Sequence, residues 1–369
     1  MRIGILTFHF NYNYGAVLQA YASVCALRAL GHEPEIVNYV PSYLRADASY
    51  FRGLGIRNGG WRTKIWARLT DMPRRLKFDS FRRRHLPVSR RVKKSGLAQL
   101  GDSYDILYVG SDQVWNLNWM HDFDGFYFCD YLSESSKARP VAYAACFGAV
   151  KQPEGHLRKA SSLIRRFQSV GVRNQMSSQM VANIAAGVAS QLVCDPTLLH
   201  DFSDIRVRRD NGDYIVVYAL DAGGVNRAKD YCDAIKKELG NMPVWFIRND
   251  RVASVPWADR VVSDADPGEW LNLIADARAV VTDSFHGCIF AMKYKRTLRA
   301  YSSGWRAMRM LELFGHLEVS YVLDGGEDFY LWKVDGANDA LVQHIQDRMK
   351  FMANESKAWL GKELSLRVE

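Results

Sequence analysis

The chain has 369 residues, of which 48% are hydrophobic and 24% charged, as is typical of a soluble globular protein with two domains of ordinary size. Its six cysteines form no C-x-x-C pair, which excludes a disulfide-dense secreted framework and favours reduced thiols in a cytoplasm. No run of about 18 apolar residues is present, and the first residues lack the length and cleavage site of a signal peptide. We therefore expect a cytoplasmic protein without a membrane-spanning helix.

The positive charge is concentrated in one segment. Between Arg62 and Lys94 there are thirteen Lys and Arg residues against Asp71 and Asp79, a net charge of +11 within a chain whose total is +9. The remainder of the chain is therefore slightly acidic, and the basic segment is predicted to be an insert with a role of its own.

Apolar residues within this insert recur at helical spacing. Ile65, Leu69, Met72 and Leu76 are separated by four, three and four residues, which predicts one apolar stripe. Pro73 is tolerated best in a first helical turn. The pattern therefore predicts two short amphipathic helices, the second capped by Thr70 or Asp71, with Arg and Lys on the outer faces.

Strands and helices alternate along the rest of the chain. In the first half, strands are predicted at 2–7, 35–39, 105–109, 141–145, 169–172 and 191–194, with helices at 16–30, 156–167 and 175–185. In the second half, strands are predicted at 214–219, 244–247, 261–262, 279–282 and 297–301, with helices at 226–239, 270–275, 286–293 and 305–314. A final helical pair is predicted from about 339 to 364.

This order predicts an α/β protein of two Rossmann-like domains in a GT-B-like arrangement, with the C-terminal helical pair crossing back. The N-terminal domain spans residues 1–200 and includes the basic helical insert, 57–94. A linker at 201–213 leads to the second domain, 214–335, and the C-terminal helices occupy 336–369. In such folds ligands lie in the cleft outside the carboxyl ends of the strands.

Polar clusters follow two predicted strands of the first domain. Asn11, Asn13 and Tyr14 follow the first strand and precede a helix. The second cluster follows the third strand and comprises Asp112, Gln113, Trp115 and Asn116. Carboxylate and amide groups bind sugar hydroxyls and an indole stacks on a pyranose, so both clusters are candidate acceptor-binding sites. Asp112 is also a candidate general base.

Three further clusters are candidates for binding an anionic donor. Arg173 follows a strand and its guanidinium can pair with a carboxylate or phosphate. Ser284 and His286 open a helix beside Asp283, and a histidine in such a loop is a candidate general acid. The last of these three clusters opens the next helix and comprises Ser303, Gly304 and Arg306.

Each cluster also has an ordinary structural interpretation. The cluster after the first strand is compatible with an Asn/Gly turn, and the next with a capping Asp112 beside a core Trp115. Arg173 is compatible with an ordinary exposed arginine, His286 with a core histidine, and Ser303 with a serine helix cap. No metal-binding spacing, Walker A loop or nucleophile elbow is present, so neither a metal nor a cofactor is expected.

Several segments together resemble the motifs of the polysaccharide pyruvyl transferase family. They lie, in family order, at residues 13–22, 110–116, 143–148, 172–173, 195–199, 282–287 and 306–315. The resemblance implies a GT-B-like fold, phosphoenolpyruvate as co-substrate and donor, and an acceptor sugar with two suitably placed hydroxyls in a surface polysaccharide such as a capsule or exopolysaccharide.

The resemblance places Arg173 and His286 at donor-binding positions. Ser284 stands where some members carry an arginine, and Arg306 is the expected substitute. In the hypothetical mechanism, His286 protonates the enol methylene and Asp112 assists attack by the acceptor hydroxyl.

The basic segment, residues 62–94, predicts contact with anionic lipids at the inner face of the cytoplasmic membrane, where a polyprenyl-diphosphate-linked acceptor would be found. A nucleic-acid partner is not expected, because no aromatic platform accompanies the charge. Two other functions remain open: a nucleotide-sugar-dependent GT-B glycosyltransferase, and a non-enzymatic basic protein associated with membranes.

Overall fold

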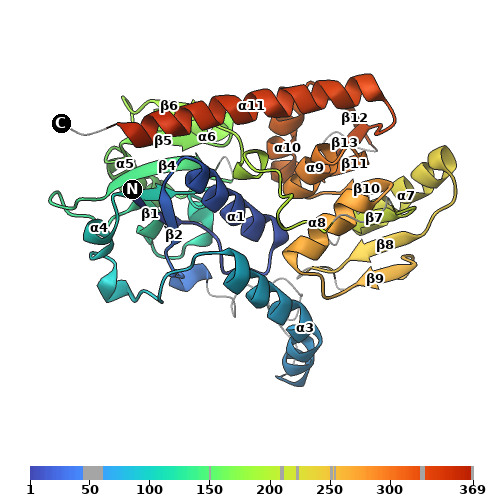
Figure 1. Ribbon diagram of the computed structural model, residues 1–369, viewed down its shortest axis with the longest axis horizontal. Helices are drawn as coiled ribbons and strands as arrows, with labels where there is room; N and C mark the ends of the chain where they lie inside the picture. The colour runs from blue at the N-terminus through green and yellow to red at the C-terminus, as the bar shows by residue number, and fades with distance from the viewer. Residues whose placement is uncertain are drawn as a thin grey trace.

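A computed structural model shows two α/β domains, each built on its own sheet, with one long helix lying across both (Figure 1). The structure describes residues 1–44, 61–148, 151–207, 212–221, 224–249, 252, 255–324 and 329–366, without the side chains of 61–70 and 305. The start of the predicted insert at 57–60, part of the predicted linker at 208–211 and the last three residues lie outside this description.

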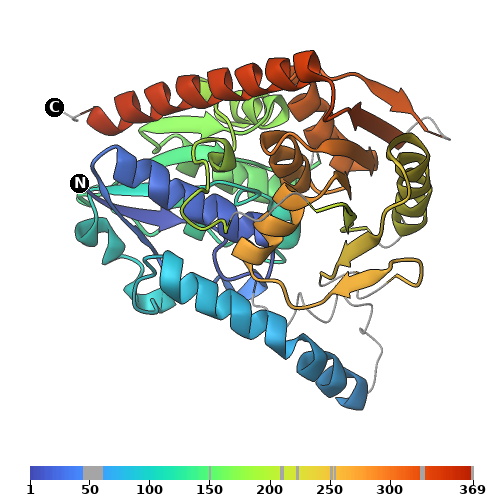
Figure 2. The ribbon, with the colours of Figure 1, turned by 45° about the vertical axis from the view of Figure 1, so that its right-hand side comes forward.

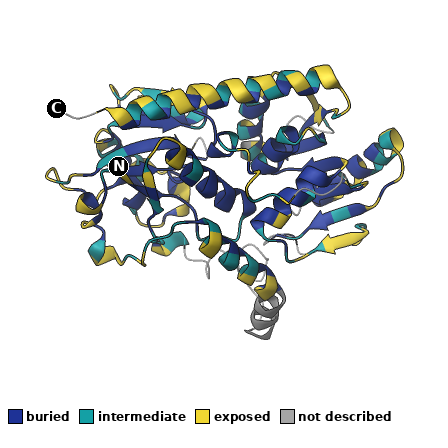
Figure 3. Cartoon of the chain, in the orientation of Figure 1, coloured by how far each residue is buried: buried dark blue, intermediate teal, exposed yellow. Residues whose placement is uncertain are grey.

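The first domain contains a six-stranded, wholly parallel sheet in the order β2-β1-β3-β4-β5-β6. Its strands are β1 (Arg2–Leu6), β2 (Glu33–Ile36), β3 (Ile106–Val109), β4 (Arg139–Ala145), β5 (Ser169–Val172) and β6 (Ser190–Leu192). Its helices are α1 (Tyr14–Ala29), α4 (Leu100–Ser103), α5 (Glu154–Ile164) and α6 (Gln175–Ile184). The central strands are buried on both faces, as expected of a parallel sheet covered by helices (Figure 3).

The second domain contains a seven-stranded sheet in the order β12-β13-β11-β10-β7-β8-β9. Its strands are β7 (Ile215–Tyr218), β8 (Val244–Ile247), β9 (Arg260–Val262), β10 (Ala279–Thr282), β11 (Thr297–Ser303), β12 (Tyr321–Leu323) and β13 (Phe329–Val334). Its helices are α7 (Val225–Leu239), α8 (Pro267–Asp276), α9 (Phe285–Lys293) and α10 (Gly304–His316). The antiparallel strands β12 and β13 were not predicted; β12 is short and exposed, so its three residues show no buried pattern.

Short 3-10 turns complete the fold at η1 (Ser42–Leu44), η3 (Lys94–Gly96), η4 (Leu117–Trp119), η5 (Phe126–Phe128) and η6 (Pro196–Leu198). Among the helices that the structure describes, none is long and apolar enough to span a lipid bilayer.

The C-terminal segment forms one helix, α11 (Asp339–Ser365), where a helical pair was predicted. No glycine or proline interrupts it before Gly361, and the Asn338 side chain caps its start by accepting from the N–H of Leu341 (3.1 Å). The predicted crossing back is confirmed: in the second domain Gln346 donates to the carbonyl of Met292 (2.8 Å), and in the first the N–H of Cys194 donates to Ser356 Oγ (2.8 Å).

The basic insert also forms one helix, α3 (Trp61–His85), so the prediction of two helices was wrong. Pro73 lies inside the helix, where it costs about 3 kcal/mol. Burial of Phe78 and Phe81 further along, 0% and 2% exposed, favours continuation of the helix. Asp71 is not a cap, because its carboxylate accepts from the Nε atoms of Arg74 (2.8 Å) and Arg75 (2.9 Å).

Helix α3 contacts both domains, so its cations do not all lie on the outer face as predicted (Figure 2). Toward the first domain, Arg74 donates to the carbonyl of Tyr12 and Arg82 to that of Asn11, each at 3.0 Å. Toward the second, Lys77 Nζ lies 3.1 Å from Asp264 and 3.0 Å from Glu269. The helix therefore holds the loop after β1 against the start of α8.

Candidate active site

Three adjacent strands of the first sheet end in polar residues at the same edge. Asp112 follows β3, Cys146 follows β4 and Arg173 follows β5, and these strands are neighbours in parallel register. Arg173 is 3% exposed; its Nη2 lies 3.1 Å from Asp112 Oδ1 and its Nη1 lies 2.8 Å from Asp195 Oδ2. The sheet thereby places one buried cation between two carboxylates.

The facing edge of the second sheet supplies the start of α9. Asp283 accepts from the N–H groups of Leu220 (2.6 Å) and Asp221 (2.7 Å), which follow β7. Burial raises the pKa of Asp283 to about 6, although these two N–H groups oppose the shift. Ser284 is the N-cap of α9, and its hydroxyl accepts from the N–H of Gly287 (3.3 Å). These bonds fix the first turn, which carries His286.

His286 and Asp195 join the two halves of the site. His286 Nε2 lies 3.5 Å from Asp195 Oδ2, and the two residues are 8% and 3% exposed. Burial would raise the pKa of Asp195, but His286, Arg173 and the N–H of Thr197 together hold it well below the usual range. Asp195 belongs to one of the family-like segments, yet it was not predicted as a site residue.

Gly15 allows α1 to pass directly beside the His286 ring. A Cβ atom at position 15 would lie 2.1 Å from His286 Nδ1 and 2.4 Å from its Cγ, closer than atoms can approach. The absence of a side chain at Gly15 therefore allows the imidazole to occupy its place.

We expect Gly15→Ala to move the His286 ring and to lower turnover by about tenfold, because small displacements of reacting groups are costly. Gly361→Ala in α11 is the matched control, because the atom nearest to the added Cβ would be 3.8 Å away. Steady-state kinetics of both variants would test this. Equal activity of the two would show that the glycine is not needed to position His286.

Helix α10 supplies the predicted Arg306 and also Arg309, which was not predicted. Arg306 lies in the first turn of α10, and its Nη2 is 3.5 Å from Asp221 Oδ2 at the cleft. One turn later, Arg309 lines a cavity of about 30 Å³ together with Arg173, Asp195 and Phe285. Burial and the nearby Arg173 lower the pKa of Arg309. The sequence signal was its spacing of three from Arg306, which places both on one helix face.

The start of α10 is open to solvent. Ser303 and Gly304 are exposed, and the Ser303 side chain makes no capping hydrogen bond. Gly304 has φ of 56°, a left-handed conformation that glycine adopts without strain. The N-terminus of α10 is therefore accessible to an anion beside Arg306.

Two aromatic residues predicted to bind the acceptor are packed in the interior, so those predictions are corrected. Trp115 is 0% exposed, stacks on Phe128 and donates to the carbonyl of Tyr127 (3.0 Å). It is therefore a core residue, as the structural alternative predicted. Tyr14 is 1% exposed, stacks on Trp270 and donates to the carbonyl of Ala265 (3.1 Å), so it packs between the domains.

The other predicted acceptor residues make local structural contacts near the site. Asn13 caps α1 by accepting from the N–H of Ala16 (3.0 Å). The buried Asn116 donates to Gln113 Oε1 (3.0 Å) and accepts from the N–H of Asn118 (3.2 Å). Asn11 uses its carbonyl to bind Arg82. Of this group, Asp112 is the one that contacts the cluster around Arg173.

Within the described chain, Cys25, His200 and Asp204 place possible metal-ligand atoms within 4.8 Å of one another. The Asp204 carboxylate already has partners, because Tyr21 donates to one oxygen and His200 Nε2 lies 2.9 Å from the other. This arrangement is satisfied without an ion and lies apart from His286.

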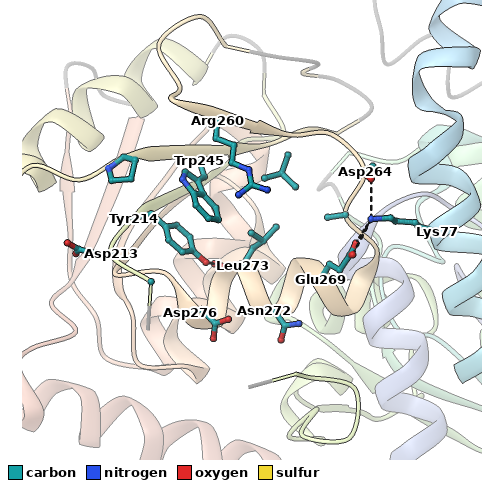
Figure 4. Close-up of a pocket in the computed structure, with 14 residues that line it drawn as sticks. Lys77, Asp213, Tyr214, Trp245, Arg260, Asp264, Glu269, Asn272, Leu273 and Asp276 are labelled. Carbon is teal, nitrogen blue, oxygen red and sulfur yellow. Dashed lines mark hydrogen bonds and ion pairs between the residues drawn. The ribbon is translucent and has the colours of Figure 1, made fainter. Parts of the chain in front are cut away.

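A cavity of about 520 Å³ lies elsewhere (Figure 4). It is lined near the amino ends of β7, β8 and β9, where Tyr214 stacks on Trp245 and Arg260 covers the other indole face. Lys77 lies at one end, bound to Asp264 and Glu269. None of the candidate site residues lines it, so size alone does not locate the active site here.

Two Rossmann-like domains whose polar strand ends face each other define the class of GT-B-fold proteins. The sequence model of the family described as polysaccharide pyruvyl transferase matches residues 13–300, and the chain belongs to this family. No curated protein sequence matches the chain.

Solved structures share the fold at low identity. UDP-GlcNAc 2-epimerase from Neisseria meningitidis, bound to UDP-GlcNAc, is 9% identical with a TM-score of 0.50, over 99% of both chains. UGT89C1 from Arabidopsis thaliana, complexed with quercetin, is 10% identical with a TM-score of 0.49, also over 99% of both chains. The likeness to the epimerase supports the GT-B fold.

Proposed function

We propose that this protein transfers the pyruvyl group of phosphoenolpyruvate to a sugar and forms a ketal, in the synthesis of a bacterial surface polysaccharide. The observation that carries the proposal is the cluster of His286, Asp195, Arg173 and Arg309 between the domains. It combines a proton donor with guanidinium groups suited to a small, doubly anionic substrate.

The donor carries a carboxylate and a phosphate, so it needs several positive or N–H groups. Arg173 and Arg309 face one cavity, and Arg306 lies on the same side of α10 beside the open helix start at Ser303 and Gly304. Ser284 is occupied as a helix cap, so we assign the role of the arginine absent there to Arg309, with Arg306 at the cleft. The carboxylate and phosphate would be divided between these groups.

His286 acts as the general acid in the proposed reaction. It donates a proton to the enol methylene, which becomes a methyl group, and the adjacent carbon gains oxocarbenium character. An acceptor hydroxyl attacks that carbon and gives its proton to Asp112. The second hydroxyl then attacks the same carbon, gives its proton to the now neutral His286 and displaces phosphate. The phosphate leaves with the C–O electron pair and takes up the proton held by Asp112, and the ketal ring closes. Asp195 orients His286, whose Nε2 lies 3.5 Å from its carboxylate.

The cavity lined by Arg173, Asp195 and Arg309 is small. Its volume of about 30 Å³ is close to that of one water molecule, so phosphoenolpyruvate does not fit without movement. Arg173 and His286 come from different domains, and we propose that the domains separate to admit the donor and close again over it.

Donor binding is tested by thermal stability with and without phosphoenolpyruvate. At 100 times the dissociation constant, a ligand that binds the native state adds about 2.7 kcal/mol of stability. We expect a clear shift in the wild type and a much smaller one in Arg309→Gln. This variant should itself remain folded, because it removes one of two neighbouring like charges. The exposed Arg158→Gln in α5 serves as control and should respond as the wild type does.

The same assay separates the alternatives. A shift with a nucleotide diphosphate sugar but none with phosphoenolpyruvate would indicate a glycosyltransferase. No shift with either, and silent substitutions throughout the cleft, would indicate a non-enzymatic membrane-associated protein. We further propose that the acceptor is carried on polyprenyl diphosphate, which extraction and mass analysis of pyruvylated lipid intermediates would test.

A further inference from the structure

Helix α3 exposes two large apolar side chains on the face turned away from the protein. Met72 and Leu76 are 41% and 58% exposed, although they lie one turn apart between buried residues. The opposite face carries Arg74 and Phe78, which are 1% and 0% exposed. The helix is therefore anchored on one side and unpartnered on the other.

The cations of this region fall into two groups. Arg74, Arg75, Lys77 and Arg82 are bound to carboxylates of the protein. A second group is exposed and forms no ion pair with a carboxylate within the described part of the chain: Arg83, Arg90, Arg91 and Lys93. Arg83 lies two turns from Leu76, on the same face of the helix. Of these exposed cations, Arg83 therefore lies on the helix face of the apolar pair, and the others follow the end of the helix.

Helix α3 also occupies an edge of the molecule, and its amino-terminal end projects beyond both domains (Figures 1 and 2). In the sequence, the spacing of Met72 and Leu76 continues back to Ile65 and Leu69. A projecting helix with an apolar stripe and unpaired cations fits a flat surface that is apolar beneath an anionic layer.

We propose that α3 binds an anionic membrane surface, with Met72 and Leu76 entering the boundary between headgroups and acyl chains. The exposed cations at Arg83 and at residues 90–94 would bind the lipid phosphates. A nucleic acid would satisfy the charge but would give the apolar pair no partner, so the observations favour lipid. This inference does not rest on pyruvyl transfer.

Docking through α3 would place the candidate acceptor side of the cleft near the membrane. Arg74 and Arg82 hold the loop at Asn11 and Tyr12, which leads from β1 into α1 and so to Gly15 beside His286. If the proposed function holds, a lipid-linked acceptor would reach the cleft from this side.

The test is co-sedimentation of the full-length protein with vesicles of phosphatidylcholine alone, or of phosphatidylcholine with about one third phosphatidylglycerol. We expect binding to the mixed vesicles that weakens with salt, and little binding to the neutral ones. Met72→Ser with Leu76→Ser should weaken binding by about tenfold or more, given the transfer free energy of the two side chains. Arg90→Glu with Arg91→Glu should weaken it by about tenfold or more.

Matched controls lie on α11. Phe351→Ser removes an apolar side chain that is 57% exposed, and Lys350→Glu with Lys357→Glu reverses two exposed charges. Both should bind as the wild type does, and unchanged thermal stability will confirm that all variants fold. If the serine variant binds the vesicles as the wild type does, the proposal is overturned. If the glutamate variant loses binding in that case, the surface binds polyanions in general through its charge. Equal losses in the α11 controls would overturn it as well.

Discussion

Replacing His286 by alanine is expected to lower turnover by about 10²-fold or more, the usual loss when a general acid is removed. The donor methylene must receive a proton before the acceptor oxygen can bond to the adjacent carbon. Among the described residues at the junction of the two domains, His286 is the imidazole that pairs with Asp195, the buried carboxylate that also binds Arg173. The measurement is release of phosphate from phosphoenolpyruvate in the presence of acceptor.

The effect of His286→Ala must be separated from a loss of folding, because the substitution leaves Asp195 without one of its charge partners. His286→Gln retains a polar side chain of similar size and should be as inactive but more stable. Asp195→Asn should keep the acid in place and lose less activity, which distinguishes a positioning residue from the acid itself. His344→Ala, at an exposed ion pair with Glu318 on the far helix, is the control. Near-normal turnover in folded His286→Gln would remove this residue from the mechanism.

Most of the fold could be predicted because parallel strands are buried on both faces. Such strands appear in the sequence as short apolar runs that end in glycine or polar residues, and three of them, 169–172, 244–247 and 279–282, are predicted with the observed bounds. The prediction was wrong where tertiary contacts outweigh local preference. Pro73 would favour a new helix, but buried Phe78, Phe81 and Arg74 hold α3 as one.

The candidate site was only partly predictable, since position in a motif does not show where a side chain points. Trp115 lies three residues after Asp112, which contacts Arg173, but its indole turns into the core. Asp195 precedes a proline at a 3-10 turn, so it resembles an ordinary cap until the two domains bring Arg173 and His286 to it. Gly15 similarly resembles a turn glycine, and only the structure shows the imidazole beside it.

Arg173→Ala is expected to abolish stabilisation by phosphoenolpyruvate and to lower the free energy of unfolding by about 3–5 kcal/mol at pH 7, the usual range for removing one partner of a buried ion pair. The guanidinium is 3% exposed and lies between Asp112 and Asp195, whose side chains are 17% and 1% exposed. Without it, the Asp195 carboxylate would remain buried with less compensation. Urea unfolding measures the loss of unfolding free energy. A thermal shift with phosphoenolpyruvate measures the loss of donor binding.

The pH dependence identifies the ion pair as the cause. The pKa of Asp195 lies well below its usual range despite burial, because His286, Arg173 and the N–H of Thr197 favour the charged form. A carboxyl with a depressed pKa contributes stability that is complete above its unfolded pKa of about 3.9 and is lost as the pH falls below it. The difference in unfolding free energy between wild type and Arg173→Ala should therefore be largest near neutral pH and narrow below about pH 4.

Two further variants separate charge from shape at this position. Arg173→Lys keeps the charge but cannot pair with both carboxylates as a planar fork, so it should recover part of the stability and little of the donor response. Adding Asp195→Asn to Arg173→Ala should recover part of the lost stability, because it removes the charge left unpaired. If Arg173→Ala were destabilised equally at neutral and acidic pH, lost packing would be the cause. A normal phosphoenolpyruvate response in that variant would place the donor elsewhere in the cleft.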